Sequence, residues 1–324
     1  MGTRYLLRRL GQAAVTVILI VLFNFVLFRL MPGSPERALP RNPHISQQTL
    51  AETRARWGLD QPLFPNQFVG YIASTARGDL GYSLKYDGAT VVDVLAGHFW
   101  PTVILFGVGE ILAVVVGFAL GAYSGWRRGG PIDFVGNGAS LILYSMPYFV
   151  IGMLLLVVFA TGLGWFPTSG MLSLGAVYQS PIDRLLDFLG HFMLPVLTVA
   201  LGLVGQYSIL MRSSVIETLS EDYVTTARAK GLTDARILRR HALPNAMLPA
   251  VTLVAINLGY VVAGAITVEI VFNWPGLGTL TVDALAARDY PVLQGCFLLL
   301  SVTVVFANVA ADFLYGALDP RVRA

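Results

Sequence analysis

The segment Asp222–Pro244, DYVTTARAKGLTDARILRRHALP, is a polar and basic stretch set between two long apolar runs. Ser220 can cap a helix ahead of it, and Gly231 favours the left-handed conformation that commonly ends a helix. Thr233 can then start a second helix, which Pro244 is expected to end. The pattern predicts two short helices joined at a glycine, and we call Asp222–Pro244 the elbow. A membrane-spanning helix does not need such a segment, so the elbow either contacts something outside the bilayer or is an ordinary loop whose arginines face phospholipid headgroups.

The remaining composition is typical of a membrane protein. Hydrophobic residues make up 55% of the 324 residues, charged residues only 13%, and the mean hydropathy is +0.67, whereas ordinary soluble domains are about 25% charged. A helix needs about 20 apolar residues to cross the hydrocarbon core. The sequence contains six such runs, at about 10–31, 100–124, 134–161, 191–212, 246–272 and 292–317. We therefore predict an all-α membrane protein with six transmembrane helices.

Lysine and arginine gather in segments that fall on one side of a six-span chain. They lie before the first span, between the second and third spans, throughout the region from Arg212 to Arg240, and at Arg321 and Arg323. The positive-inside rule places such segments in the cytoplasm, so both termini and the elbow are expected there. The net charge of only +3 argues against nucleic acid as a partner and leaves membrane lipid. Because the first apolar run is longer than the core of a signal peptide, we expect an uncleaved first span.

Motifs of catalysis are missing from the sequence. No G-x-x-x-x-G-K-[ST] phosphate-binding loop, H-E-x-x-H or G-x-S-x-G occurs, so we expect neither ATP binding nor a hydrolase site in this chain. The four histidines lack the spacing of metal ligands, and Cys296 is the only cysteine. These observations favour a transport subunit over an enzyme, with no cofactor and no metal of its own. A secondary transporter or channel and a structural scaffold are the contrasting classes.

The spacing within the elbow matches that of a known loop. Thr225-Thr226-Ala227, three residues, Gly231, nine residues and His241-Ala242-Leu243-Pro244 resemble EAA-x3-G-x9-I-x-LP, the EAA loop of the inner-membrane subunits of ABC importers. Thr225 and Thr226 replace the usual Glu-Ala, and His241 replaces the usual isoleucine. The resemblance implies a coupling helix that docks on a separate ATPase. The residues implied to couple are Tyr223, Thr225, Thr226, Ala227, Gly231, Ile237, Leu238, His241, Leu243 and Pro244.

Motifs outside the elbow narrow this resemblance. LMPGSPE at 30–36, WGLDQPL at 57–63, GDLGYSL at 78–84, PGLG at 275–278 and DPR at 319–321 resemble the B-type permeases of dipeptide, oligopeptide and nickel importers (DppB/OppB-like). The resemblance implies the MetI-like fold of type I ABC importer permeases, with an enlarged first external loop that contacts a substrate-binding protein. It also implies a prokaryotic inner membrane protein that pairs with a second, C-type permease and with two ATP-binding subunits or domains holding ATP and Mg²⁺. The implied substrate is a di- or oligopeptide, and nickel chelates, haem and oligosaccharides remain open.

These expectations divide the chain into four parts. Residues 1–32 form the first transmembrane helix with a cytoplasmic N-terminus, and 33–98 form an extracytoplasmic lobe. Residues 99–317 form a core of five transmembrane helices that includes the coupling loop 213–245, and 318–324 form a cytoplasmic tail. In the lobe, Gln47–Leu59 is predicted to be an amphipathic helix and Gly78–Ser83 a turn followed by a short extended piece. The lobe either docks a binding protein, as the resemblance implies, or is a structural lid.

Polar residues inside the predicted spans are candidates for the translocation pathway. They are Glu110, Asn257, Glu269 and Asn308. An ionisable group within the bilayer is costly and is expected to face other helices or water. For Glu110 a hydrogen bond between helices is the commoner outcome, and Glu269 lies near enough to the outer boundary to reach water.

Glycine and proline are expected to shape the spans. Pro147 predicts a kink in the third span. The segment Arg184–Phe188 in the second external loop predicts a short surface helix. Close helix packing is expected at the small residues of the second span, which are Gly107, Gly109, Gly117 and Gly121.

Overall fold

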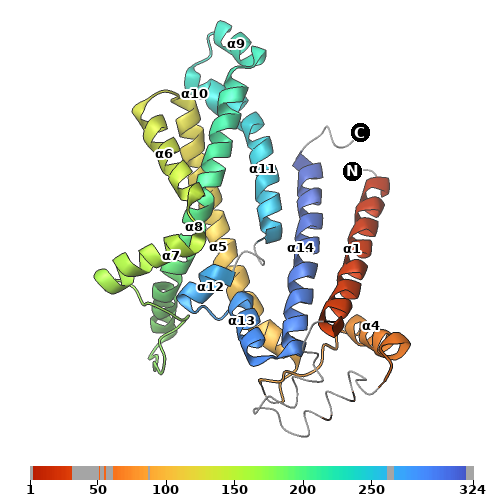
Figure 1. Cartoon of the computed structure of the whole chain (residues 1–324). Helices are drawn as coiled ribbons and strands as arrows, with labels where there is room; N and C mark the ends of the chain where they lie inside the picture. The colour runs from red at the N-terminus through yellow and green to blue at the C-terminus, as the bar shows by residue number, and fades with distance from the viewer. Residues whose placement is uncertain are drawn as a thin grey trace. The chain divides into compact units, whose positions relative to one another are not determined.

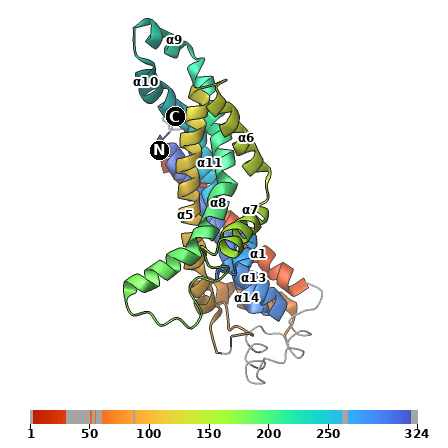
Figure 2. The same cartoon turned by 90° about the vertical axis from the view of Figure 1, so that its left-hand side faces the viewer.

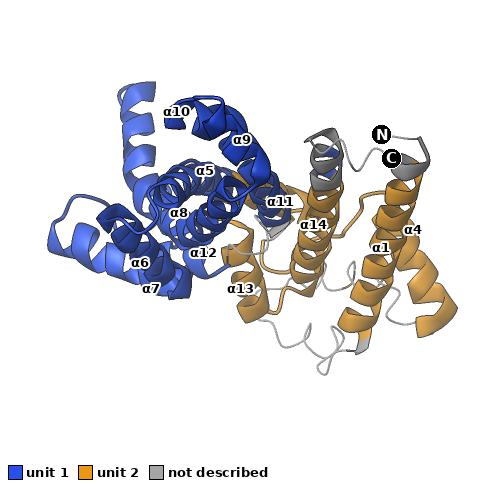
Figure 3. Ribbon diagram, turned by 90° about the horizontal axis from the view of Figure 1, so that it is seen from above, with its two compact units in different colours: residues 1–2, 104–274, 310–324 blue, residues 3–103, 275–309 orange. Residues whose placement is uncertain are grey.

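The computed structural model describes residues 3–30, 51, 55, 61–86, 88–260 and 266–318, and Figure 1 shows these residues as helices joined by loops. A single antiparallel bridge, between Tyr82 and Thr90, is the only extended pairing in the described part. The all-α prediction is therefore confirmed. The chain divides into two compact units, coloured in Figure 3. Unit 1 comprises residues 1–2, 104–274 and 310–324, and unit 2 comprises residues 3–103 and 275–309.

Unit 1 is organised around the long helix α8, Pro181–Leu219, on which α6, α7 and α11 pack. Ser180 caps α8, because its hydroxyl accepts the Asp183 N–H at 3.2 Å while Asp183 accepts the Ser180 N–H at 3.0 Å. The short surface helix predicted at Arg184–Phe188 is thus wrong as a separate element, since α8 continues from it into the predicted fourth span. Pro195 lies inside α8, and Figure 2 shows the first turns of α8 running at an angle to the rest, as an internal proline favours.

Helix α5, Val91–Trp126, approaches α8 closely along a row of glycines. An added Cβ would lie 2.6 Å from Val199 Cγ1 at Gly109, 2.6 Å from Tyr207 Cβ at Gly117 and 2.3 Å from the Ser208 carbonyl oxygen at Gly121. Real Cβ atoms do not come so near, so close packing is confirmed at these three glycines. It is wrong for Gly107, where an added Cβ would meet nothing within 4 Å.

The third predicted span is broken at Pro147. Helix α6, Pro131–Ser145, and helix α7, Tyr148–Leu155, which continues as the π-helical turn η3, Leu156–Gly162, meet at an angle of 106°. Met146 between them is extended, with φ −87° and ψ 129°, because the residue before a proline avoids the helical region. The predicted kink is confirmed, and it is a complete break of the helix.

Four described helices are long and apolar enough to cross a membrane, or five if α6 and α7 form one span. The four are α1 (Thr3–Leu30), α5, α8 and α14 (Tyr290–Leu318). The predicted span 246–272 falls on α11, Leu243–Tyr260, and α12, Ile266–Phe272, and residues 261–265 between them lie outside the described part. The total of six spans therefore stays a prediction.

Unit 2 contains α1, the π-helical turn η2 (Leu63–Gln67), α4 (Phe68–Ala76), α13 (Leu277–Ala287) and most of α14. After α4 the backbone turns at Gly78 and Gly81, whose φ angles are 74° and 90°, and then forms the Tyr82–Thr90 bridge. The predicted turn and short extended piece are confirmed. The helix predicted at Gln47–Leu59 lies outside the described residues apart from positions 51 and 55, which are helical.

A buried carboxylate fixes this bridged segment to the beginning of α14. Asp289 is 1% exposed. It accepts the Ser83 hydroxyl at 2.5 Å and the N–H groups of Leu84 and Lys85 at 3.0 Å each. The segment Ser83–Lys85 therefore has a fixed position within unit 2. The predicted domain boundaries at residues 32, 98 and 317 stay predictions.

Candidate functional site

The elbow forms two helices at one end of α8 (Figure 1). Helix α9 spans Asp222–Ala229, and α10 spans Asp234–Ile237 before the chain continues through the π-helical turn η4, Leu238–Ala242, into α11. Gly231 between them has a φ of 77°. Its N–H donates to the Arg228 carbonyl at 2.9 Å, and the Leu232 N–H donates to the Ala227 carbonyl at 3.3 Å, which is the Schellman pattern of helix termination. The predicted glycine joint is confirmed.

Two details of the predicted elbow are wrong. Ser220 does not cap α9, because its hydroxyl donates to the Glu217 carbonyl at 2.6 Å at the end of α8, and Glu221 takes the N-cap position. Pro244 does not end the second helix but lies at the second position of α11. The wider π-helical turn before Pro244 moves the carbonyl that the proline ring would otherwise meet, so the helical path continues.

A small apolar core holds the two elbow helices together. Val224 and Ile237 are completely buried, Ala227 is 6% exposed, and Leu219 and Leu232 pack against them. Ala227 and Ile237 were predicted to couple to an ATPase, but the structure places them inside the elbow. The other predicted coupling residues are exposed (Tyr223, Thr225, Thr226, Gly231 and Pro244) or half-buried (Leu238, His241 and Leu243).

Hydrogen bonds also tie α9 to the start of α11. The Asn245 amide donates to the Tyr223 hydroxyl oxygen at 2.9 Å and to the His241 carbonyl at 2.8 Å. On α9 itself, the Thr226 hydroxyl donates to the Asp222 carbonyl at 3.0 Å. The elbow is therefore anchored at both of its ends, through Leu219 of α8 and through Asn245 of α11.

A partly buried ion pair connects α8 to the first turn of α6. Arg212 Nε lies 2.6 Å from Asp133 Oδ1, Arg212 donates a second bond of 2.9 Å to Asp133 Oδ2, and the Gly129 N–H donates to Oδ2 at 2.9 Å. Asp133 is 5% exposed. Two parallel bonds between a guanidinium and a carboxylate fix orientation as well as distance, so this pair sets the register of α8 against α6.

Deeper in unit 1, a buried polar network joins α5, α8 and α11. Glu110 is 3% exposed and accepts a hydrogen bond from the Tyr207 hydroxyl. The Asn257 amide donates to the Tyr207 oxygen at 2.9 Å and to Gln206 Oε1 at 3.3 Å. Two predicted pathway residues, Glu110 and Asn257, are thus brought together through Tyr207. The hydrogen bond between helices expected for Glu110 is confirmed, and its pathway role stays a prediction.

The other two pathway candidates lie elsewhere. Glu269, on α12, is completely buried, so the expectation that it reaches water is wrong. The Trp274 N–H donates to the Glu269 carbonyl at 2.8 Å, and Trp274 is itself fully buried against Phe188 and Phe192. Asn308, on α14, is exposed and belongs to unit 2.

The described residues contain no group of three or more His, Cys, Asp or Glu side chains placed to hold a metal ion. An anchored elbow, an oriented ion pair and a buried polar network follow one another along α8.

Two family models cover most of the chain. The model of the binding-protein-dependent transport system inner membrane component matches residues 117–324, and the model of the N-terminal part of such membrane components matches residues 2–102. The chain belongs to the binding-protein-dependent transport inner membrane component family. It is a permease subunit of a binding-protein-dependent importer and, within that family, resembles the DppB/OppB-like permeases. The secondary transporter, the channel and the structural scaffold are set aside.

Relatives of this permease align over its whole length. It is 38% identical to a putative peptide permease protein of Brucella suis over 99% of each chain. It is also 38% identical to the glutathione transport system permease protein GsiC of Salmonella typhimurium over 98% of each chain. A probable peptide ABC transporter permease protein of Sinorhizobium fredii is 37% identical over 98% of this chain and 99% of its own.

The solved structure of the MetNI methionine ABC transporter, in an inward-facing conformation, supports the fold of this permease. The TM-score is 0.57 at 17% sequence identity, over 70% of this chain and 97% of that chain. The MetI-like, type I importer permease fold is thus confirmed, as is a multi-pass membrane protein.

Sequence reasoning missed two residues on which the permease's internal contacts depend. Tyr207 connects Glu110 to Asn257, and Asp133 holds Arg212. Asp133 follows a Gly-Gly-Pro turn and begins an apolar helix, which is the position of an ordinary first-turn acid. Its pairing over 79 residues with Arg212 has no local signal.

Proposed function

We propose that this permease imports di- or oligopeptides. The full-length similarity to permeases named for peptide and for glutathione, itself a peptide, carries the proposal. Nickel chelates, haem and oligosaccharides are the alternative substrates, and no relative among those described here is named for them.

In the proposed assembly the permease forms half of the translocation pathway, and a second, C-type permease forms the other half. Two ATP-binding subunits or domains hold ATP and Mg²⁺, and an extracytoplasmic binding protein delivers the substrate. Both termini and the elbow lie in the cytoplasm, as the basic segments favour. The elbow and the Arg127–Arg128 turn lie at the same end of unit 1 in Figure 1, which supports this orientation.

The proposed coupling runs from the elbow along α8. The exposed Thr225 and Thr226 on α9 contact the ATPase, while the small core around Ile237 keeps the elbow rigid. Closure of the ATPase dimer on ATP moves the elbow, and α8 carries the displacement past Arg212 to the Tyr207–Glu110 network. Alternating access results if the hydrogen-bonded groups of the Tyr207–Glu110 network are arranged differently in the inward-open and outward-open states. ATP and the binding protein select between these two states.

The decisive experiment is uptake by the complete transporter in lipid vesicles. Radiolabelled dialanine and glutathione, each added outside the vesicles with its binding protein, should accumulate only in vesicles that contain ATP and whose elbow faces the lumen. Nickel chelate and haem serve as competing substrates under the same conditions. Uptake that continues after ATP depletion would contradict coupling, and uptake of nickel chelate or haem in place of peptides would contradict the proposed substrate.

A further inference from the structure

Unit 2 contains a polar cavity that the transport mechanism above does not use. Its volume is about 170 Å³, and it lies between η2, α4, the turn at Asp79–Gly81 and the start of α14, with Arg29 at the end of α1. A volume of that size corresponds to about five or six water molecules at about 30 Å³ each. The cavity is thus large enough for a small molecule but not for a folded chain segment.

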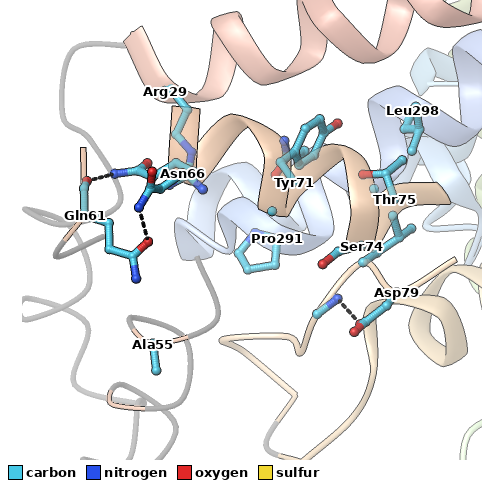
Figure 4. Close-up of a pocket in the computed structure, with 16 residues that line it drawn as sticks. Arg29, Ala55, Gln61, Asn66, Tyr71, Ser74, Thr75, Asp79, Pro291 and Leu298 are labelled. Carbon is cyan, nitrogen blue, oxygen red and sulfur yellow. Dashed lines mark hydrogen bonds between the residues drawn. The ribbon is translucent and has the colours of Figure 1, made fainter. Parts of the chain in front are cut away.

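Opposite charges line the two ends of this cavity. Figure 4 shows Arg29 at one end and Asp79 at the other, with Tyr71 and Ser74 on α4 between them. The Arg29 guanidinium carbon lies 5.7 Å from the centroid of the Phe25 ring, which holds the cation beside the cavity. Asp79 accepts the Gly81 N–H at 3.1 Å through Oδ1, so the turn fixes the position of its carboxylate. Both charges are therefore held in place before any ligand arrives.

Hydrogen-bonding groups occupy the wall between the charges. Gln61 orients two amides, since Asn66 donates to Gln61 Oε1 at 3.1 Å and Gln67 donates to the Gln61 carbonyl at 2.8 Å. The hydroxyl oxygen of Tyr71 is shielded from solvent and has Thr75 and Gln294, which also line the cavity, as polar neighbours. Burial raises the pKa of Tyr71, so the phenol stays protonated and can donate. A ligand in the cavity offers an acceptor to this hydroxyl.

The geometry also leaves space beside α4. Gly70 lines the cavity in a helical conformation, and an added Cβ there would meet no atom within 4 Å. Neither the backbone nor a neighbour therefore requires glycine at this position, although glycine in a helix costs about 1 kcal/mol relative to alanine. Gly70 leaves open volume in the cavity, next to its polar side chains.

We propose that this cavity binds a short zwitterionic peptide of about dipeptide size, with its carboxylate on Arg29 and its ammonium group on Asp79. A planar guanidinium matches a carboxylate with two parallel bonds, and an aspartate is the natural partner of an ammonium group. The amides and Tyr71 hydrogen-bond to the peptide linkage between the two charges. The choice of a peptide rests on the proposed function, but the test below measures binding without transport, so the two can fail separately.

The test is calorimetric titration of the purified full-length permease in phosphatidylcholine nanodiscs with dialanine. We expect saturable binding that weakens at least about tenfold in Arg29→Gln and in Asp79→Asn. Blocked probes separate the two charges, because N-acetyl-dialanine lacks the ammonium group and dialanine amide lacks the carboxylate. N-acetyl-dialanine should bind weakly to the wild type and be insensitive to Asp79→Asn, and dialanine amide should be weak and insensitive to Arg29→Gln.

Gly70→Trp tests the cavity without changing a charge, since the indole would fill the open volume. The matched control is Ala76→Trp, at an exposed position on the same helix that does not line the cavity. Binding should be lost in Gly70→Trp and unchanged in Ala76→Trp. No saturable binding up to about 10 mM, or binding that survives Gly70→Trp, would overturn the proposal. The phosphate and primary ammonium group of phosphatidylethanolamine present the same chemistry, whereas phosphatidylcholine has no N–H donor. Weaker dialanine binding in phosphatidylethanolamine nanodiscs than in phosphatidylcholine nanodiscs would therefore assign the cavity to lipid and also overturn the proposal.

Discussion

At the residue scale, the most informative side chain is Glu110. It is a carboxylate with 3% exposure, and its hydrogen bond comes from Tyr207 on another helix. A buried carboxylate that bonds its neighbours serves structure, whereas one that lines a pathway serves transport. The two roles give different results when the charge and the hydrogen bond are removed separately.

Glu110→Gln removes the charge and keeps an oxygen that can accept the Tyr207 hydroxyl. We expect uptake within about twofold of the wild type and a thermal unfolding midpoint that is nearly unchanged, because an uncharged acceptor costs less to bury. The measurement is peptide uptake in vesicles beside thermal unfolding in the same lipid. Loss of uptake in a normally folded Glu110→Gln transporter would instead establish a pathway role.

Tyr207→Phe keeps the charge and removes the donor to Glu110. A buried group left without its partner costs about 1–3 kcal/mol, so we expect a lower unfolding midpoint than in Glu110→Gln. Tyr178→Phe is the matched control, because Tyr178 also donates to a carboxylate, Asp187 at 2.7 Å, but in an exposed loop. Equal losses in the two phenylalanine variants would show that burial of Glu110 does not matter.

The sequence predicted which residues would be special at this scale, but not their partners. Glu110 was identified as a candidate because a carboxylate is rare in an apolar run. Tyr207 lies 97 residues away, and no local pattern connects them. Glu269 was misplaced for a related reason: nearness to the end of a span does not reveal whether aromatic side chains such as Trp274 close over that region.

At the scale of elements, the joint at Gly231 determines the path of the chain through the elbow. Proline at this position can adopt neither the φ of 77° nor the hydrogen bond that the Gly231 N–H makes. We expect Gly231→Pro to reduce uptake per ATP hydrolysed by roughly 5- to 30-fold, which corresponds to 1–2 kcal/mol of strain. ATP hydrolysis itself, on the partner subunits, should persist.

The matched control for this joint is Gly175→Pro. Gly175 has a φ of 72°, and an added Cβ there, as at Gly231, would meet nothing within 4 Å. It lies in the loop before α8, away from the elbow. Uptake per ATP should therefore be unchanged in Gly175→Pro, and a normal ratio in Gly231→Pro would refute the coupling role of the joint.

The contact between α5 and α8 gives a second test among elements. Gly121→Leu would force a side chain against the Ser208 carbonyl, 2.3 Å from the position of its Cβ, whereas Gly107→Leu would enter open space. Overpacking costs about 1–3 kcal/mol, so only Gly121→Leu should lower the unfolding midpoint and the yield of folded protein. Similar yields and midpoints for the two variants would show that the helices can separate freely.

Elements were largely predictable because their signals are local. Pro147 indicated the break between α6 and α7, and Gly231 indicated the joint of the elbow. The failures occurred where a signal depends on tertiary structure. Pro244 was expected to end a helix, but the π-helical turn before it accommodates the proline ring. Gly107 is a glycine in an apolar span like Gly109, Gly117 and Gly121, but it faces away from α8.

At the scale of the whole molecule, the orientation in the membrane is the main expectation that remains to be tested. Cys296 is the only cysteine and is buried, so a Cys296→Ala background permits single-cysteine labelling. Val177→Cys, at a loop position that is 92% exposed, should react with a membrane-impermeant maleimide in intact spheroplasts. Thr225→Cys, on the elbow, should react only after lysis, and the reverse pattern would place the elbow outside the cytoplasm.

The general architecture followed from composition, whereas the compact units did not. Hydropathy alone indicated a helical membrane protein, because a helix of about 20 apolar residues has the length needed to cross the hydrocarbon core. The division of the chain into units at residues 103–104, 274–275 and 309–310 could not be predicted, since unit 2 combines the N-terminal third with α13 and most of α14. Such a grouping depends on contacts across the sequence, of which Asp289 provides an example.

The Asp289 contact also sets an order of events during biosynthesis. Leu84 precedes Asp289 by 205 residues, and a ribosome adding about 5–20 residues per second needs roughly 10–40 s to cover that interval. During that time Ser83–Lys85 lacks the carboxylate that accepts its hydrogen bonds. The segment Ser83–Lys85 therefore completes its contacts only after Asp289, immediately before α14, has been synthesised.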